Sequence, residues 1–131
     1  MDNNNRTGRP GITFTVGDGC ICLHQTTLNA IGRPDYFKIL FDKDSNLIAL
    51  QGCKEKDVGA VTIYYANANN PDSSKRYERV YSKGVARMLY DECGWNPEYS
   101  YRIYGTEIES HKVAIFDLKA AEKLDKTIIE N

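Results

Sequence analysis

The sequence predicts an α+β fold of two tandem β-β-α-β-β repeats that pack as one compact, mostly antiparallel β unit with short helices. Short stretches that alternate apolar and polar residues, as half-buried strands do, recur along the chain. Twice such a stretch runs directly into a segment with helical spacing, at residues 20–32 and again at 77–94. Each helical segment ends at a glycine with a proline shortly after it, namely Gly32 with Pro34 and Gly94 with Pro97.

The first repeat covers residues 12–53 and contains two predicted hairpins joined by a helix. The first hairpin is "ITFTVGDGCICLHQ", where the residues at 17–19 tolerate the positive φ of a tight turn. Thr26 or Thr27 is expected to cap the following helix, and Gly32 to end it. The second hairpin pairs "YFKILF" with "LIALQ" across the turn "DKDSN".

The second repeat, at residues 58–118, has the same predicted order with a longer first connection. "AVTIYYA" is predicted as a strand and "RYERVY" as its returning strand, across the loop "NANNPDSSK". Ser82 is expected to cap the second helix, which Gly94 ends. "YSYRIY" and "KVAIFDL" are then predicted to form the closing hairpin. The offset between corresponding residues grows slowly along the chain, as loop insertions between duplicated units would make it.

The two ends of the chain are predicted to lie outside the repeats. Residues 1–11 are polar and are expected to form a flexible arm, and residues 119–131 a C-terminal helix or tail. No apolar run approaches the roughly 20 residues that cross a bilayer, and the N-terminus lacks the apolar stretch of a signal peptide. The sequence therefore predicts a cytoplasmic protein without membrane contact.

Composition limits the function classes. Lys and Arg number 17 against 18 Asp and Glu, so no global excess of positive charge attracts nucleic acid. The cysteines have neither zinc-site spacing nor the density of a secreted disulfide framework, and are expected to be buried thiols: Cys20, Cys22, Cys53 and Cys93. Cys20 and Cys22 are expected to share one strand face and to pack there as small apolar side chains.

The sequence predicts no metal, no cofactor and no catalytic residue. No nucleophile, base and orienting group come together in the chain. The two histidines, His24 and His111, are expected to be structural or surface residues, because neither has a neighbouring carboxylate and nucleophile in a recognisable arrangement.

The stretch "ITFTVGDGCICLHQTTLNAIGRPDYFKILFDKDSNLIAL" resembles the swapped-hairpin unit of AbrB-type transition-state regulators. In that family a strand, a short turn, a second strand, a helix closed by Leu-Gly or Ile-Gly and a final hairpin follow in order. Tandem copies in one chain are similar to the MraZ branch of that superfamily. The resemblance covers about residues 12–118 and implies a DNA-binding transcriptional regulator. Because Cys20 stands where the family has a turn arginine, the resemblance favours DNA contacts in the second repeat.

The candidate ligand site is a basic and aromatic segment at the start of the second predicted helix. Cations, two tyrosines able to stack on bases, and a helix N-terminus that favours anions lie close together in this segment. The candidate phosphate-binding residues are Lys75, Arg76, Tyr77, Arg79, Tyr81, Ser82, Lys83 and Arg87. Arg6 and Arg9 in the N-terminal arm are expected to add contacts with nucleic acid.

Three functions remain open, and all are non-enzymatic. The first is a homo-oligomeric DNA-binding regulator of the AbrB type in a bacterial cell, whose affinity comes mainly from phosphate neutralisation. The second is a phage-encoded protein that sequesters a small anionic nucleotide signal in the infected bacterium, since a near-neutral chain with one Arg/Lys/Tyr cluster suits a few phosphates better than a polyanion. The third is a protein-binding inhibitor module that uses its nine tyrosines.

Overall fold

The computed structural model describes residues 8–16, 19–65 and 77–124, and its strands form two five-stranded antiparallel sheets. Sheet A contains β1 (Gly11–Thr15), β2 (Cys20–His24), β6 (Tyr77–Tyr81), β7 (Ser100–Tyr104) and β10 (Glu122–Leu124). Its strand order is β10-β7-β1-β2-β6. Sheet B contains β3 (Tyr36–Asp42), β4 (Leu47–Cys53), β5 (Val61–Thr62), β8 (Thr106–Ile108) and β9 (Val113–Asp117). Its strand order is β5-β3-β4-β9-β8.

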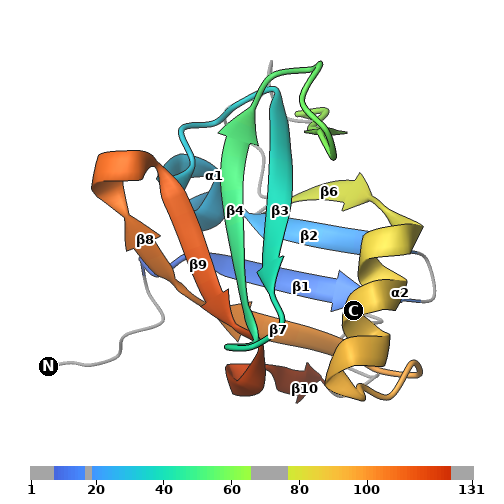
Figure 1. Cartoon of the computed structure of the whole chain (residues 1–131). Helices are drawn as coiled ribbons and strands as arrows, with labels where there is room; N and C mark the ends of the chain where they lie inside the picture. Colours follow the sequence, from blue (N-terminus) through green and yellow to red (C-terminus); the bar gives the residue numbers. More distant parts are fainter. Residues whose placement is uncertain (1–7, 17–18, 66–76, 125–131) are drawn as a thin grey trace, which may run out of the picture.

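The two sheets enclose one hydrophobic core. In Figure 1 the strands of sheet B run across those of sheet A. Phe14 from sheet A and Phe37 and Phe116 from sheet B are fully buried in this core. The α+β class and the mostly antiparallel pairing that the sequence predicts are therefore confirmed.

Both hairpins predicted in the first half are formed. β1 pairs with β2 so that Ile12 lies opposite Leu23, and Gly19 in the connecting turn has a φ of 65°. β3 pairs with β4 along their whole length, and Asn46 at the end of their turn has a φ of 58°. Asparagine is among the few residues that tolerate this left-handed conformation, which explains why the turn forms at "DKDSN".

Both strand-to-helix transitions are also confirmed. Helix α1 (Gln25–Ala30) follows β2 directly, and helix α2 (Lys83–Cys93) follows β6 after one residue. The glycines predicted to end them do so in the left-handed conformation, with φ of 87° at Gly32 and 65° at Gly94.

The cap predicted at Thr26 or Thr27 is wrong, whereas Ser82 takes the predicted N-cap position of its helix. His24 occupies the N-cap position of α1, and Thr27 lies inside that helix, where its buried hydroxyl donates to the Gly11 carbonyl at 2.6 Å. Ser82 occupies the N-cap of α2, but its side chain makes no capping hydrogen bond. Instead its backbone N–H donates to the Gly19 carbonyl at 2.8 Å. In both cases a contact with sheet A replaces the local cap.

Strand pairing in the second half differs from the prediction. The strand that contains β5 does not pair with β6, because β5 joins β3 in sheet B and β6 joins β2 in sheet A. The predicted closing hairpin is also wrong, since β7 pairs with β1 and β10 whereas β9 pairs with β4 and β8. The second-half strands instead pair with both edges of the first-half hairpins, whose backbone ladders would otherwise be open.

The chain makes a close backbone approach where it leaves sheet A after β7. At Gly105, a Cβ atom would overlap the Ile115 carbonyl and the Phe116 ring. The glycine thus lets the chain pass against β9 and enter β8 of the other sheet.

The C-terminal segment is a strand where the sequence predicts a helix or tail. After a 3₁₀ turn at Leu118–Ala120, β10 pairs with the open edge of β7, with Glu122 opposite Arg102. An unpaired strand edge supplies hydrogen-bond partners that a short polar helix lacks, and this decides the outcome. Residues 125–131 of the predicted tail lie outside the described residues.

Candidate functional site

The face of sheet A that points away from sheet B is polar and aromatic. Successive residues of a strand point to opposite faces, so the buried Ile21, Leu23 and Val80 point to the core and their neighbours to the other side. We call this surface the outer face of sheet A; it comprises Thr13, Thr15, Cys20, Cys22, His24, Tyr77, Arg79, Tyr81, Arg102 and Tyr104.

Large side chains on this face flank a strip of small ones. The central strands β1 and β2 contribute threonines, cysteines and, at the end of β2, His24, whereas β6 and β7 contribute tyrosines and arginines. The strand register sets Arg79 opposite Cys22, and Arg102 opposite Thr13. Two arginines, one on β6 and one on β7, therefore lie on one sheet face with three strand spacings between them.

Arg79 is the exposed cation of this face. Its guanidinium carbon lies 5.6 Å from the centroid of the Tyr77 ring, and Nη2 donates to the Tyr77 hydroxyl at 3.2 Å. Hydrogen bonds to the Tyr77 and Tyr81 hydroxyls raise the pKa of Arg79 above its ordinary value. Among the described residues no carboxylate forms an ion pair with it. Arg79 thus offers a permanent positive charge between two phenol rings.

The positive charge of Arg102, on the opposite side of this face, is balanced by the carboxylate of Glu122. Its Nε atom lies 3.5 Å from Oε1 of Glu122, and its guanidinium carbon lies 5.4 Å from the centroid of the Tyr104 ring. The neighbouring His24 places Nε2 3.1 Å from the Thr13 hydroxyl, and its ring meets Tyr104 edge-on. Burial and the charge of Arg102 lower the pKa of His24. This side of the face therefore favours a neutral imidazole.

Cys20 and Cys22 lie side by side on this face, with 3.8 Å between their sulfur atoms. They share one strand face as predicted, and Cys20 is buried, whereas Cys22, Cys53 and Cys93 are half-buried. The shared face is the one that points away from the core, which Ile21 and Leu23 fill instead. The hydrogen bond between the thiols and burial raise the pKa of Cys22, and Arg79 acts in the opposite direction. All four cysteines are described, and no disulfide joins them.

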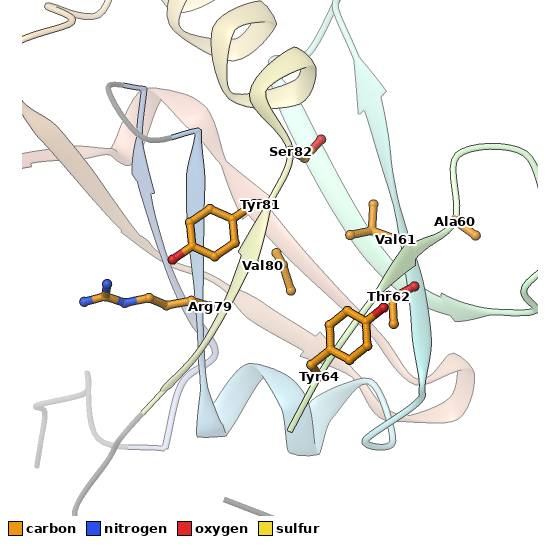
Figure 2. A pocket seen from close by; sticks show the side chains of 8 residues that line it. All are labelled: Ala60, Val61, Thr62, Tyr64, Arg79, Val80, Tyr81 and Ser82. Atoms are coloured by element: carbon orange, nitrogen blue, oxygen red, sulfur yellow. The ribbon is translucent and has the colours of Figure 1, made fainter. Parts of the chain in front are cut away.

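A groove of about 500 Å³ lies beside this face, between β6 and the segment that contains β5. Its lining residues are Ala60, Val61, Thr62, Tyr64, Arg79, Val80, Tyr81 and Ser82. Figure 2 shows the side chains of Arg79 and Tyr81 pointing away from Val61 and Tyr64. The guanidinium of Arg79 thus belongs to the outer face of sheet A. The apolar lining of the groove, which includes Val61 and Val80, lies between β6 at the edge of sheet A and β5 at the edge of sheet B.

The structure separates the remaining predicted site residues. Lys83 is exposed, and its side chain packs against Gly19 in the β1–β2 turn. Arg87 lines a different depression of about 290 Å³ next to Trp95. Arg9 lies at the other end of sheet A, where its guanidinium donates to the carbonyls of Gly105 at 2.9 Å and Tyr104 at 3.1 Å. Lys75, Arg76 and Arg6 lie outside the described residues.

The sequence predicts that Tyr77, Arg79 and Tyr81 belong to one site. It does not predict that Arg102 and Tyr104 lie on the same sheet face. Arg102 and Tyr104 join this face because β7 pairs with β1, a contact between residues far apart in the chain. The alternation in "SYRIY" already indicates that these two side chains point away from the core. It does not indicate which strand β7 joins.

Residues 8–16, 19–65 and 77–124 contain neither a cluster of metal ligands nor a long apolar helix. Within these ranges no three His, Cys, Asp or Glu side chains are grouped so that they could hold a metal ion. No helix there has the length and apolar character needed to span a membrane.

No family model matches the chain. The comparisons with curated proteins and with solved structures also give no match.

Proposed function

We propose that this chain is a non-enzymatic binding protein for a small nucleotide that carries one or two phosphates, held at Arg79 on the outer face of sheet A. The supporting observation is the position of Arg79 between Tyr77 and Tyr81, with no carboxylate partner among the described residues. A guanidinium can donate two parallel hydrogen bonds to one phosphate, and phenol rings stack on nucleobases. The hydroxyl of Thr13 and the imidazole of His24 add neutral polar partners on the same face.

The distribution of cations favours a small anion over a long polyanion. Arg79, Lys83, Arg87 and Arg9 point to different parts of the molecule, and Arg102 is compensated by Glu122. A duplex requires several phosphate contacts along its length, whereas one or two phosphates need only a few donors. The near-neutral charge of the chain agrees with the smaller ligand.

A thermal-shift experiment tests this function. The whole protein is heated with cyclic dinucleotides and with ADP-ribose derivatives as the probes, and a binding nucleotide should raise the melting temperature. A ligand at about 100 times its Kd stabilises the native state by roughly 2.7 kcal/mol. Arg79→Ala should abolish the shift, and Arg87→Ala, which removes an exposed arginine from another surface, should keep it. An equal shift in wild type and Arg79→Ala would refute the site, and no shift with any probe would refute the function.

A DNA-binding regulator is the second candidate. It is supported by the exposed cations Arg79, Lys83 and Arg87, which follow one another from β6 into α2, and by the resemblance to AbrB-type regulators. Fluorescence anisotropy with a labelled duplex should then show binding that weakens steeply with salt, with a slope of about −0.9 per phosphate contact in a double-logarithmic plot. Arg79→Ala should reduce that slope by about 1. Absence of binding at low salt would exclude this candidate and leave the nucleotide proposal intact.

The tandem arrangement itself remains part of the proposal. Its support is the double occurrence of a strand that runs into a helix ended by a left-handed glycine, at Gly32 and at Gly94. The strand pairing of the two halves differs, so duplication would have been followed by exchange of strands between the sheets. A relative whose first and second halves are similar to each other in sequence would support duplication. Relatives in which a similar first half is joined to an unrelated second half would oppose it.

A further inference from the structure

Strand β6 is an open edge of sheet A. Among the described residues its ladder partner is β2 on one side only. The other edge strands, β5, β8 and β10, have two or three residues each, whereas β6 has five. An edge of this length presents a row of backbone donors and acceptors that another strand can pair with.

The hydrogen bonds to β2 reveal which backbone groups point outward. Ser82 donates its N–H to Gly19, so the pair Ser82–Gly19 continues the β2–β6 register as a hydrogen-bonded pair. Such pairs alternate with non-bonded pairs in an antiparallel ladder. The backbone groups of Val80 and Glu78 therefore bond to β2 as well. Those of Tyr77, Arg79 and Tyr81 point away from β2, toward the open edge.

We propose that a second copy of this chain pairs with this edge, with β6 antiparallel to the partner's β6 and the two-fold axis at Val80. The two copies of β6 must pair through the backbone groups of Tyr77, Arg79 and Tyr81, which point outward. Three registers then let at least three β6 residues of one copy pair with β6 residues of the other, and their two-fold axes lie at Glu78, Arg79 or Val80. The first sets Glu78 against the partner's Glu78, and the second sets Arg79 against the partner's Arg79. Like charges directly opposite each other destabilise an antiparallel pair, which disfavours both.

The register centred on Val80 replaces both repulsions with favourable pairs. It sets Arg79 against the partner's Tyr81 and Tyr81 against the partner's Arg79, so that each guanidinium meets a phenol ring across the strands. Tyr81 is 63% exposed, and Arg79 is exposed with no carboxylate partner among the described residues. A partner strand can therefore reach the open faces of both side chains, beside the hydrogen bonds that Arg79 makes to Tyr77 and Tyr81 of its own chain. Glu78 then faces the partner's Ser82, which can donate a hydrogen bond.

This register also uses the full extended segment. Ser82 has φ of −151° and bonds to Gly19 as a strand residue does, so residues 78–82 pair with the partner's 78–82. Val80 lines the groove beside β5, and the partner's Val80 would add apolar surface at the same place. The result is a closed two-fold dimer with one continuous sheet. The inference does not depend on the proposed ligand.

Cysteine cross-linking tests the register. Val80 and the partner's Val80 form a non-hydrogen-bonded pair, whose Cα atoms lie about 4.5 Å apart, within the range that a disulfide spans. Val80→Cys in the full-length protein, treated with a mild thiol oxidant, should give a covalent dimer on non-reducing gels. Wild type, with its four native cysteines, and Thr106→Cys, on the β8 edge, should not. A covalent dimer of Arg79→Cys without one of Val80→Cys would overturn the register.

Sedimentation of the uncross-linked protein tests the dimer itself and does not depend on how well Val80→Cys folds. Tyr81→Ala removes both cross-strand cation–π contacts and should raise the dimer Kd about 5- to 30-fold. Ile108→Ala, which truncates an exposed apolar residue on the β8 edge, should leave the Kd unchanged. A wild-type protein that stays monomeric at high concentration, or equal Kd values for Tyr81→Ala and wild type, would overturn the proposal.

Discussion

The imidazole of His24 lies over the backbone of Gly11 so closely that a methyl group on the glycine would overlap the ring atom Nδ1. His24 ends β2 and occupies the N-cap position of α1, and Gly11 begins β1 beside it. Gly11 is not among the residues with positive φ, so space rather than conformation requires a glycine here. The contact between His24 and Gly11 packs the start of α1 closely against β1 of sheet A.

Gly11→Ala should therefore destabilise the protein. The methyl group forces the imidazole out of its position, and overpacking of this kind costs about 1–3 kcal/mol. Chemical denaturation followed by the fluorescence of the single tryptophan, Trp95, measures the free energy of unfolding. Gly84→Ala is the control, because nothing lies within 4 Å of a Cβ there and the residue is helical. The control should gain about 0.4–1 kcal/mol, and similar effects of the two variants would contradict the steric argument.

Thr27→Val should also lower the free energy of unfolding. The substitution keeps the shape of the buried side chain and removes the hydroxyl that donates to the Gly11 carbonyl at 2.6 Å. Loss of a buried hydrogen bond costs about 1–3 kcal/mol when a partner is left unsatisfied. Thr26→Val, one residue earlier in α1 and half-buried, should change stability by less than about 0.5 kcal/mol. Equal losses in the two variants would show that the hydroxyl of Thr27 contributes nothing specific.

His24 should make stability fall as the solution becomes acidic. Burial and the charge of Arg102 lower the pKa of His24 in the folded protein below its ordinary value of 6.5. Below pH 6.5 the unfolded chain therefore binds a proton before the folded protein does, and the free energy of unfolding decreases. Above that pH the residue is neutral in both states and adds no pH dependence.

The measurement for His24 compares the free energy of unfolding at pH 7.5 and 5.5. His24→Gln should reduce the difference, whereas His111→Gln, at an exposed position, should not. A difference that persists unchanged in His24→Gln would assign the pH dependence to other groups.

Tyr90→Phe should destabilise the packing between α2 and sheet A. The Tyr90 hydroxyl lies 2.6 Å from the Tyr99 carbonyl and 3.0 Å from the Phe14 carbonyl, and its ring packs edge-on against Trp95. Phenylalanine keeps the ring contacts and removes the donor, at a cost of about 1–3 kcal/mol. Tyr64→Phe, at a side chain that is 80% exposed, should be neutral in the same denaturation experiment. A neutral Tyr90→Phe would mean that water replaces the hydroxyl.

The candidate site was only partly predictable from the sequence. The alternation in "RYERVY" was sufficient to place Tyr77, Arg79 and Tyr81 on one strand face, because that periodicity is local. Lys83 and Arg87 follow closely in the chain, yet the turn into α2 points them to other surfaces. Arg102 and His24 reach the face of Arg79 through the pairing of β7 with β1 and of β6 with β2.

Local pattern was thus enough to predict the α+β class, the two first-half hairpins and the two strand-to-helix transitions, since alternation, helical spacing and left-handed glycines act within a few residues. It was not enough to predict that β5 joins β3, that β7 joins β1, or that the chain after Leu118 returns as β10. Every open strand edge offers the same backbone hydrogen bonds, so the choice of partner depends on how the apolar faces of distant segments are buried together. The pairing of strands therefore depends on the packing of the whole core. The same pairing also brings together the side chains on the outer face of sheet A.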